Sequence, residues 1–149
     1  MRGIVSAVVL LLVGGLAGAA SAPGAVTAID AARVREAFEK GLPLLETAAY
    51  KVPASRREAA GVGEVHARDT DILYVLEGSA TLVTGGILVE PKEVAPDEIR
   101  GPAIQGGETR EIAKGDVVVV PNGTPHWFRA VQPPVLYYVV KVTDTGAAR

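Results

Sequence analysis

One segment constrains the architecture of this chain more than any other: Gly115-Asp116-Val117-Val118-Val119-Val120-Pro121-Asn122-Gly123-Thr124-Pro125-His126. Residues 117–120 form a β-branched run bounded by turn residues, which predicts a strand buried on both faces. Pro121 and the Asn-Gly pair end that strand, and we expect a tight hairpin turn there because Asn and Gly accept a positive φ. His126 then opens a second strand, 127–131. Its imidazole is therefore expected at a rigid position, where a metal or small molecule can be held.

Other short strand patterns occupy most of the chain. Runs of apolar and β-branched residues between Gly and Pro turns predict strands over 44–52, 72–76, 80–84, 87–89, 109–113 and 135–142. The strands 72–76 and 80–84 flank Glu77-Gly78-Ser79, and we expect them to form a hairpin. Many short strands separated by turns predict an all-β sandwich or barrel.

Two segments depart from this strand pattern. Residues 27–30 have the layout of a capping box, helical spacing of apolar residues follows, and Gly41 with Pro43 ends the pattern; this predicts one short N-terminal helix. Residues 85–107 are rich in Pro, Gly and charged residues. We interpret them as a solvated excursion between strands or, alternatively, as a lid over a binding cavity.

The composition bounds the partners and the compartment. The 149 residues suffice for one domain, and a net charge of −2 gives no electrostatic reason to expect nucleic acid or an anionic membrane. A basic start, an apolar run over 4–17 and small residues up to Ala22 predict a secretory signal peptide over about residues 1–20. An uncleaved N-terminal anchor is the alternative. We therefore expect a periplasmic or secreted protein, and the absence of Cys excludes disulfides and thiolate ligands.

The segment 115–126 resembles the second motif of the cupin superfamily, G-x5-P-x-G-x2-H-x3-N, although Ala130 stands at the position of the family's Asn. Residues 64–78 resemble the first motif in a degenerate form. The resemblance covers about residues 61–142. It implies a small double-stranded β-helix, or jelly-roll barrel, over 44–142, preceded by an N-terminal segment with a short helix over 21–43 and followed by a tail over 143–149.

The same resemblance implies a metal site. Glu64 takes the position of the family's first His, His66 the second, Asp71 the Glu position, and His126 is the His of the second motif. Glu64 and His66 are two residues apart, so on a strand they share one face. These groups suit one divalent ion such as Zn, Mn, Fe, Co or Ni, with Asp71 as a secondary ligand or, alternatively, part of a capped turn.

A substrate is expected to lie beside this site. We assign Arg68, Tyr74 and Trp127 to substrate binding; the alternatives are a solvated arginine and core aromatics. No P-loop, GxSxG, HExxH or dinucleotide motif is present.

Three functions remain open. The first is a metal-dependent enzyme acting on a small polar organic molecule by dioxygenase, isomerase or lyase chemistry. The second is a non-catalytic binding module for a sugar, an organic acid or a metal, and the third is a structural domain whose histidines are satisfied polar groups. The expected partners are a small-molecule ligand and, in a homodimer, a second copy of the chain.

Overall fold

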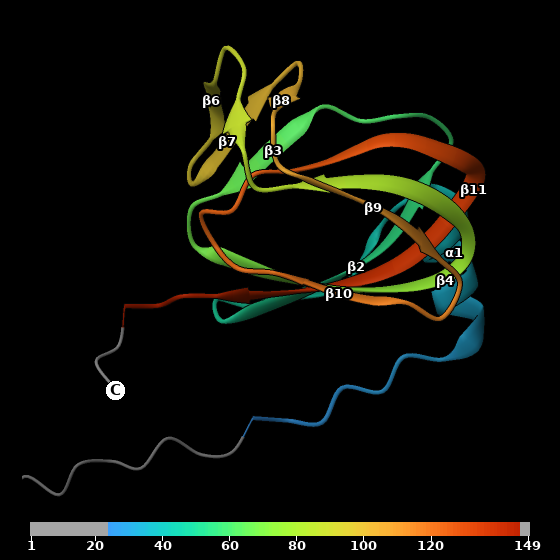
Figure 1. Cartoon of the computed structure of the whole chain (residues 1–149). Helices are drawn as coiled ribbons and strands as arrows, with labels where there is room; N and C mark the ends of the chain where they lie inside the picture. Colours follow the sequence, from blue (N-terminus) through green and yellow to red (C-terminus); the bar gives the residue numbers. More distant parts are fainter. Residues whose placement is uncertain (1–23, 147–149) are drawn as a thin grey trace, which may run out of the picture.

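Two long strands, β4 (Asp69–Thr84) and β11 (His126–Thr143), pair antiparallel from end to end and form the centre of the fold. The structure is a computed structural model that describes residues 24–146. The signal peptide predicted over 1–20 lies outside the described residues. Figure 1 shows both strands curving, so that each passes from one side of the barrel to the other.

The curved pair divides the sheet into two halves. On one half the neighbours of the central pair are β1 (Pro43–Glu46), β2 (Tyr50–Arg57) and β10 (Val117–Val120). On the other half they are β3 (Gly63–His66), β6 (Lys92–Ala95), β7 (Glu98–Gly101) and β9 (Glu108–Ala113). A separate ribbon joins β5 (Ile87–Leu88) and β8 (Ile104–Gln105). The predicted all-β jelly-roll barrel is confirmed.

The hairpin expected around Glu77-Gly78-Ser79 is wrong, because the chain continues through it as the single strand β4. Gly78 has a φ of +78°, and a Cβ atom there would lie 2.4 Å from the carbonyl oxygen of Pro134 on β11. A glycine at this point therefore lets the two strands stay close where they curve. The strands predicted over 127–131 and 135–142 are likewise one strand, β11.

The hairpin expected after Val120 is also wrong. Pro121 to Thr124 form a turn in which the Thr124 N–H donates to the Pro121 carbonyl at 3.1 Å, and Gly123 has a φ of +74°. However, β10 and β11 lie on opposite edges of the first part of β4, so this turn begins a crossover.

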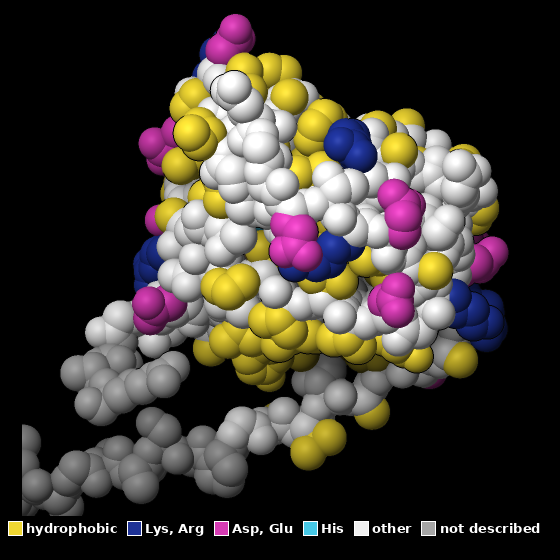
Figure 2. All heavy atoms as spheres, viewed as in Figure 1, with side chains coloured by type: hydrophobic (Ala, Val, Ile, Leu, Met, Phe, Trp, Pro, Cys, Tyr) yellow, Lys and Arg dark blue, Asp and Glu magenta, His cyan; other side chains and the backbone are white. Residues whose placement is uncertain are grey.

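The strand β10 is not buried on both faces as predicted. The side chain of Val120 is 2% exposed, whereas Val117 and Val119 are 61% and 58% exposed. The reason is that β10 is the last strand of its half, and no other element of residues 24–146 covers its outer face. Figure 2 shows hydrophobic side chains gathered along the lower surface, where Figure 1 places β10.

The predicted short helix is confirmed as α1 (Ala31–Lys40), but it begins later than the capping box suggested. Asp30 is the N-cap, and its carboxylate accepts the Arg33 N–H at 2.9 Å. The helix covers part of the outer face of the barrel through Phe38, whose ring lies 5.0 Å from that of Tyr138. No helix in residues 24–146 is both long and apolar enough to cross a membrane.

The buried core and the segment 85–107 form the remaining walls of the barrel interior. The main cluster of buried residues comes from β4, β9, β10 and β11: Leu73, Val75, Ala80, Leu82, Ile112, Val120, Phe128, Val135, Tyr137 and Val139. Residues 85–107, expected as a loop or lid, contribute four short strands, and β7 pairs with β3 to extend the barrel wall. This segment therefore forms part of the cavity wall.

Candidate functional site

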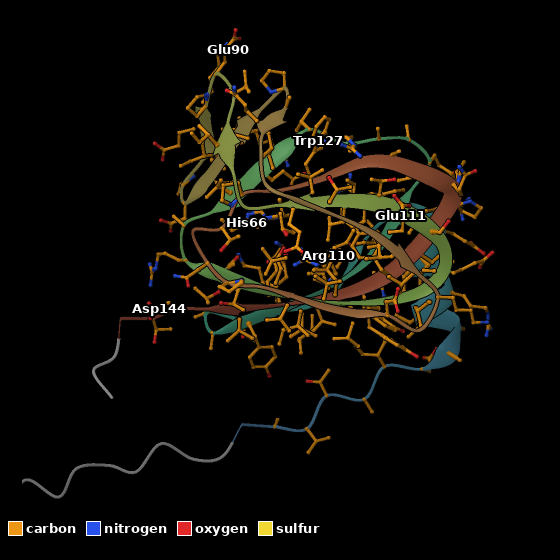
Figure 3. The ribbon with its side chains drawn as sticks, viewed as in Figure 1. His66, Glu90, Arg110, Glu111, Trp127 and Asp144 are labelled. Carbon is orange, nitrogen blue, oxygen red and sulfur yellow. The ribbon has the colours of Figure 1, made fainter. Side chains whose placement is uncertain are left out.

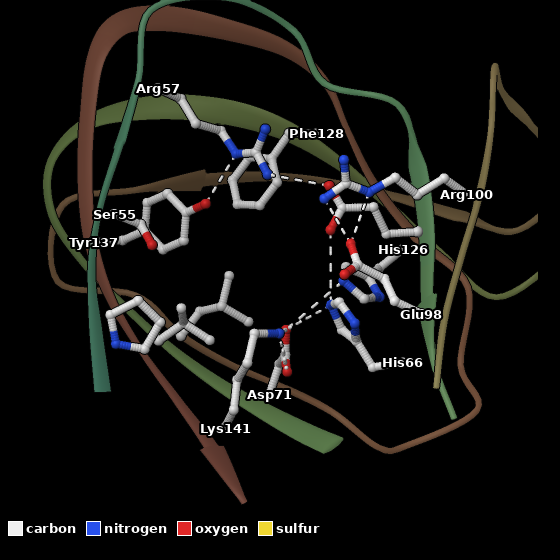
Figure 4. A pocket seen from close by; sticks show the side chains of 14 residues that line it. Ser55, Arg57, His66, Asp71, Glu98, Arg100, His126, Phe128, Tyr137 and Lys141 are labelled. Atoms are coloured by element: carbon white, nitrogen blue, oxygen red, sulfur yellow. Dashed lines mark hydrogen bonds and ion pairs between the residues drawn. The ribbon is translucent and has the colours of Figure 1, made fainter. Parts of the chain in front are cut away.

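A cavity of about 300 Å³ lies inside the barrel between the two halves of the sheet. Its lining is dominated by charged groups from strands far apart in the sequence (Figure 4). Besides two histidines, the charged members are Arg57, Glu64, Asp71, Glu98, Arg100 and Lys141. The main apolar part of the wall comes from Leu73, Phe128 and Val139.

Two adjacent strands bring Glu64, His66 and His126 together. Glu64 and His66 share the inner face of β3, as their spacing predicts, and Glu64 pairs directly with His126 on β11. One potential ligand atom from each of the three lies within 4.8 Å of the others. The two imidazole side chains are 11% and 7% exposed, and their ring centroids are 5.1 Å apart. Figure 3 shows His66 at the end of the barrel beside β3.

The chemistry of this set fits a divalent metal ion. Two imidazole nitrogens and a carboxylate oxygen suit Zn, Mn, Fe, Co or Ni, and the Nε2 of His66 lies 3.7 Å from Oε2 of Glu64. The Nδ1 of His126 lies 3.1 Å from the Thr124 carbonyl oxygen, so a proton on Nδ1 can be donated to that oxygen. The unprotonated Nε2 is then the nitrogen that can bind a metal. Burial lowers the pKa of His66, and the charge of Lys141 lowers it further. Both effects favour the neutral imidazole that a metal requires.

Asp71 lies beside this set but is engaged elsewhere. It is 4% exposed, and its Oδ2 lies 3.5 Å from Nε2 of His66 and 3.8 Å from Nε2 of His126. Both carboxylate oxygens accept hydrogen bonds from Nζ of Lys141, at 2.8 and 2.7 Å. Its negative charge is therefore already neutralised by a protein cation.

The three residues assigned to substrate binding lie outside the cavity. Arg68 is in the exposed turn before β4 and donates to the carbonyl of Asp144, the residue that follows β11 (Figure 3). Tyr74 is 44% exposed because residues 72 and 74 of β4 face outward, while 71, 73 and 75 face inward. Trp127 has the opposite orientation to His126 on β11, and its Nε1 donates to the Gly61 carbonyl at 2.8 Å.

Sequence reasoning missed the charged lining residues Arg57, Glu98, Arg100 and Lys141. Lys141 carried a detectable signal, since it interrupts an apolar strand two residues after Val139 and therefore shares its inward face. Arg57 did not, because the strand that carries it was expected to end at Val52.

Comparisons with known proteins agree with this fold. A family model described as Cupin matches residues 19–149. The chain is similar to protein BH2720 of Bacillus halodurans (15% identity, 69% of each chain, TM-score 0.51) and to the cupin domain of Schizosaccharomyces pombe Cnp3 (14% identity, 69% of this chain and 59% of that one, TM-score 0.50). KdgF from Halomonas is similar at 20% identity over 68% of this chain and 76% of that one, with a TM-score of 0.49. No curated protein matches the sequence.

Proposed function

The chain belongs to the cupin family, and we propose that it holds one divalent metal ion on Glu64, His66 and His126 and binds a small polar organic molecule beside it. The observation that carries this proposal is the convergence of two imidazoles and a carboxylate within 4.8 Å at the wall of an internal cavity. Three protein ligands leave further coordination positions open toward the cavity.

A bound ion would supply Lewis-acid polarisation of a substrate oxygen. The protein supplies the rest. Leu73, Phe128 and Val139 form an apolar wall that limits water, and Arg57 and Lys141 add fixed positive charge on the side of β2 and β11. This arrangement suits dioxygenase, isomerase or lyase chemistry on a small molecule, because each of these reactions is accelerated when the substrate is held in one orientation beside the reacting groups.

One observation favours the alternative, a non-catalytic binding module for a sugar, an organic acid or a metal. Among the described lining residues outside the proposed ligands, Lys141 is paired with Asp71 and Arg100 with Glu98. These pairs leave few groups free to carry a proton during a reaction. Turnover of a metal-loaded protein on a panel of small organic molecules decides between the two.

The proposal includes export and self-association. A basic start, an apolar run and small residues support a signal peptide over 1–20 and a periplasmic or secreted protein. Exported protein whose N-terminal sequence begins at Met1 would contradict the signal peptide.

The exposed apolar side chains on the outer face of β4 and β10 support a homodimer, and they are Ile72, Tyr74, Val117 and Val119. Light scattering measures the oligomeric state.

Metal binding itself is tested by calorimetric titration of the chelator-treated protein with Zn²⁺ and Mn²⁺. We expect one ion per chain, lost in His66→Ala and in His126→Ala. Glu64→Gln should weaken binding at least tenfold, whereas Glu98→Gln, a carboxylate in the same cavity but outside the set, is the matched control. Retention of wild-type affinity by the double variant His66→Ala/His126→Ala would contradict the proposal.

A further inference from the structure

Arg57 is held rigidly against the cavity wall. Its Nε donates to the Tyr137 hydroxyl at 2.9 Å, and its Cζ lies 4.3 Å from the centroid of the Phe128 ring. The side chain is only 23% exposed. A guanidinium fixed by a hydrogen bond at Nε and by stacking on its face keeps both Nη groups available in one plane.

Within residues 24–146 the Nη groups of Arg57 form one long ion pair, with Glu64, and no hydrogen bond. The carboxylate oxygen that faces them, Oε1 of Glu64, is 3.7 Å from Nη2. The two other cations of the cavity differ in this respect. Lys141 makes two hydrogen bonds to Asp71, and Arg100 makes short contacts of 2.7 and 2.6 Å to Glu98.

The charge of the cavity then depends on Glu64. Three cations and three carboxylates line the cavity, so their formal charges cancel. A divalent ion on Glu64 would add two positive charges and would take the carboxylate that, among residues 24–146, faces Arg57. The loaded cavity therefore carries an excess of positive charge beside an arginine with open donors, which favours an anionic ligand.

The geometry selects the kind of anion. A planar guanidinium with two open Nη groups matches a carboxylate through two parallel hydrogen bonds. A phosphate dianion would place more negative charge beside the carboxylates of Glu98 and Asp71, which repel it. It could also bind one lining arginine only, because Arg100 is already paired with Glu98. A volume of about 300 Å³ is at the small end of ligand cavities.

We infer that the cavity takes a small organic carboxylate, with the carboxylate on Arg57 and the body of the molecule along Phe128 toward the metal site. This inference rests on the metal site of the proposed function. Because Nη2 of Arg57 lies 3.7 Å from a proposed ligand residue, a group next to the anchored carboxylate lies within reach of the metal. Tyr137 acts as a positioning residue for the arginine.

The test uses the full chain loaded with Mn²⁺ and three pairs of probes that differ mainly in charge: acetate and acetamide, succinate and succinamide, benzoate and benzamide. Calorimetry should show at least one carboxylate binding at least tenfold more tightly than its amide. Arg57→Met should abolish that difference, and Arg57→Lys should restore only part of it. Arg129→Met, an exposed arginine on the same strand as Phe128, is the control and should change nothing.

The affinity for Mn²⁺ is measured on the same samples and separates the two claims. If Mn²⁺ binds and no carboxylate exceeds its amide, the inference is overturned while the proposed metal site stands. If Mn²⁺ does not bind the wild-type chain, both are overturned. Inorganic phosphate binding more tightly than every carboxylate would also overturn the inference. The wild-type comparison decides these cases even if Arg57→Met fails to fold.

Discussion

Lys141 and Asp71 lie directly opposite each other on β11 and β4, and Nζ of Lys141 donates to both carboxylate oxygens at 2.8 and 2.7 Å. The pair is buried against the imidazoles of His66 and His126. A carboxylate engaged in this way is withheld from a metal ion on the neighbouring histidines. A metal ion bound by Glu64, His66 and His126 would then keep a coordination position for a ligand.

We predict that Lys141→Met tightens metal binding at least tenfold, because it frees Asp71 as a fourth ligand and removes a positive charge from the site. The metal-free variant should be several kcal/mol less stable than the wild type, since it leaves a buried carboxylate without its partner. Calorimetry with Zn²⁺ and urea denaturation with and without Zn²⁺ measure the two effects.

The double variant Lys141→Met/Asp71→Asn is the control for this prediction. It removes the freed carboxylate, so its metal affinity should return to within a few-fold of the wild-type value. Equal affinities for the wild type and Lys141→Met would show that Asp71 does not reach the ion even when unpaired.

The limits of sequence reasoning at the site have a physical origin. Glu64 and His66 were placed on one face because side chains alternate along a strand, and that rule acts over two residues. The pairing of Asp71 with Lys141 depends on the register of strands 70 residues apart, which no local pattern specifies. Tyr74 lies on the opposite face of β4 from Asp71, as the same alternation requires for residues three apart, and its assignment to substrate binding relied on its aromatic character alone.

Val119→Asp and Val120→Asp test the corrected orientation of β10. Val119 is 58% exposed, so an aspartate there should cost no more than about 1 kcal/mol of unfolding free energy. Val120 is 2% exposed within the main core, and an aspartate there should cost more than about 3 kcal/mol. Urea denaturation of both variants gives the comparison. A large loss for Val119→Asp in monomeric protein would contradict the structure.

Gly78→Ala tests the close approach of the two central strands. Its Cβ would lie 2.4 Å from the Pro134 carbonyl oxygen and 3.0 Å from that of Gln132, in addition to the strain of a φ of +78°. We expect a loss of more than about 3 kcal/mol. Gly115→Ala is the matched control, with a φ of +96° and no atom within 4 Å of its Cβ, and should cost about 1 to 2 kcal/mol. Equal losses in thermal or urea unfolding would show that backbone strain alone explains both.

Gly78 also shows what the sequence could and could not predict about the fold. Its surroundings, Glu77 and Ser79, have the composition of a turn, and a local pattern cannot distinguish a turn from a point where a long strand curves past its partner. The turn at Pro121 to Thr124 was placed correctly, yet its role as a crossover follows from the pairing of β10 and β11 with opposite edges of β4. The class of fold was predictable because it depends on strand number and spacing.

The pH dependence of metal binding tests the environment of His66. Burial, followed by the charge of Lys141, holds the pKa of His66 below its ordinary value of about 6.5. The neutral form that binds metal therefore persists as the pH falls through 6.5, and the affinity for Zn²⁺ should decline only at lower pH. In the metal-free protein the unfolded chain takes up this proton first, so the free energy of unfolding should fall as the pH drops below about 6.5.

Lys141→Met removes one of the two causes of the lowered His66 pKa and should move the loss of Zn²⁺ affinity to higher pH. Lys51→Met removes the cation paired with Asp69 and should not move it. Calorimetry between pH 5 and 7.5, with an NMR titration of the His66 ring in metal-free protein, measures both. A loss of Zn²⁺ affinity centred above pH 6.5 in the wild type would contradict the buried environment described for this imidazole.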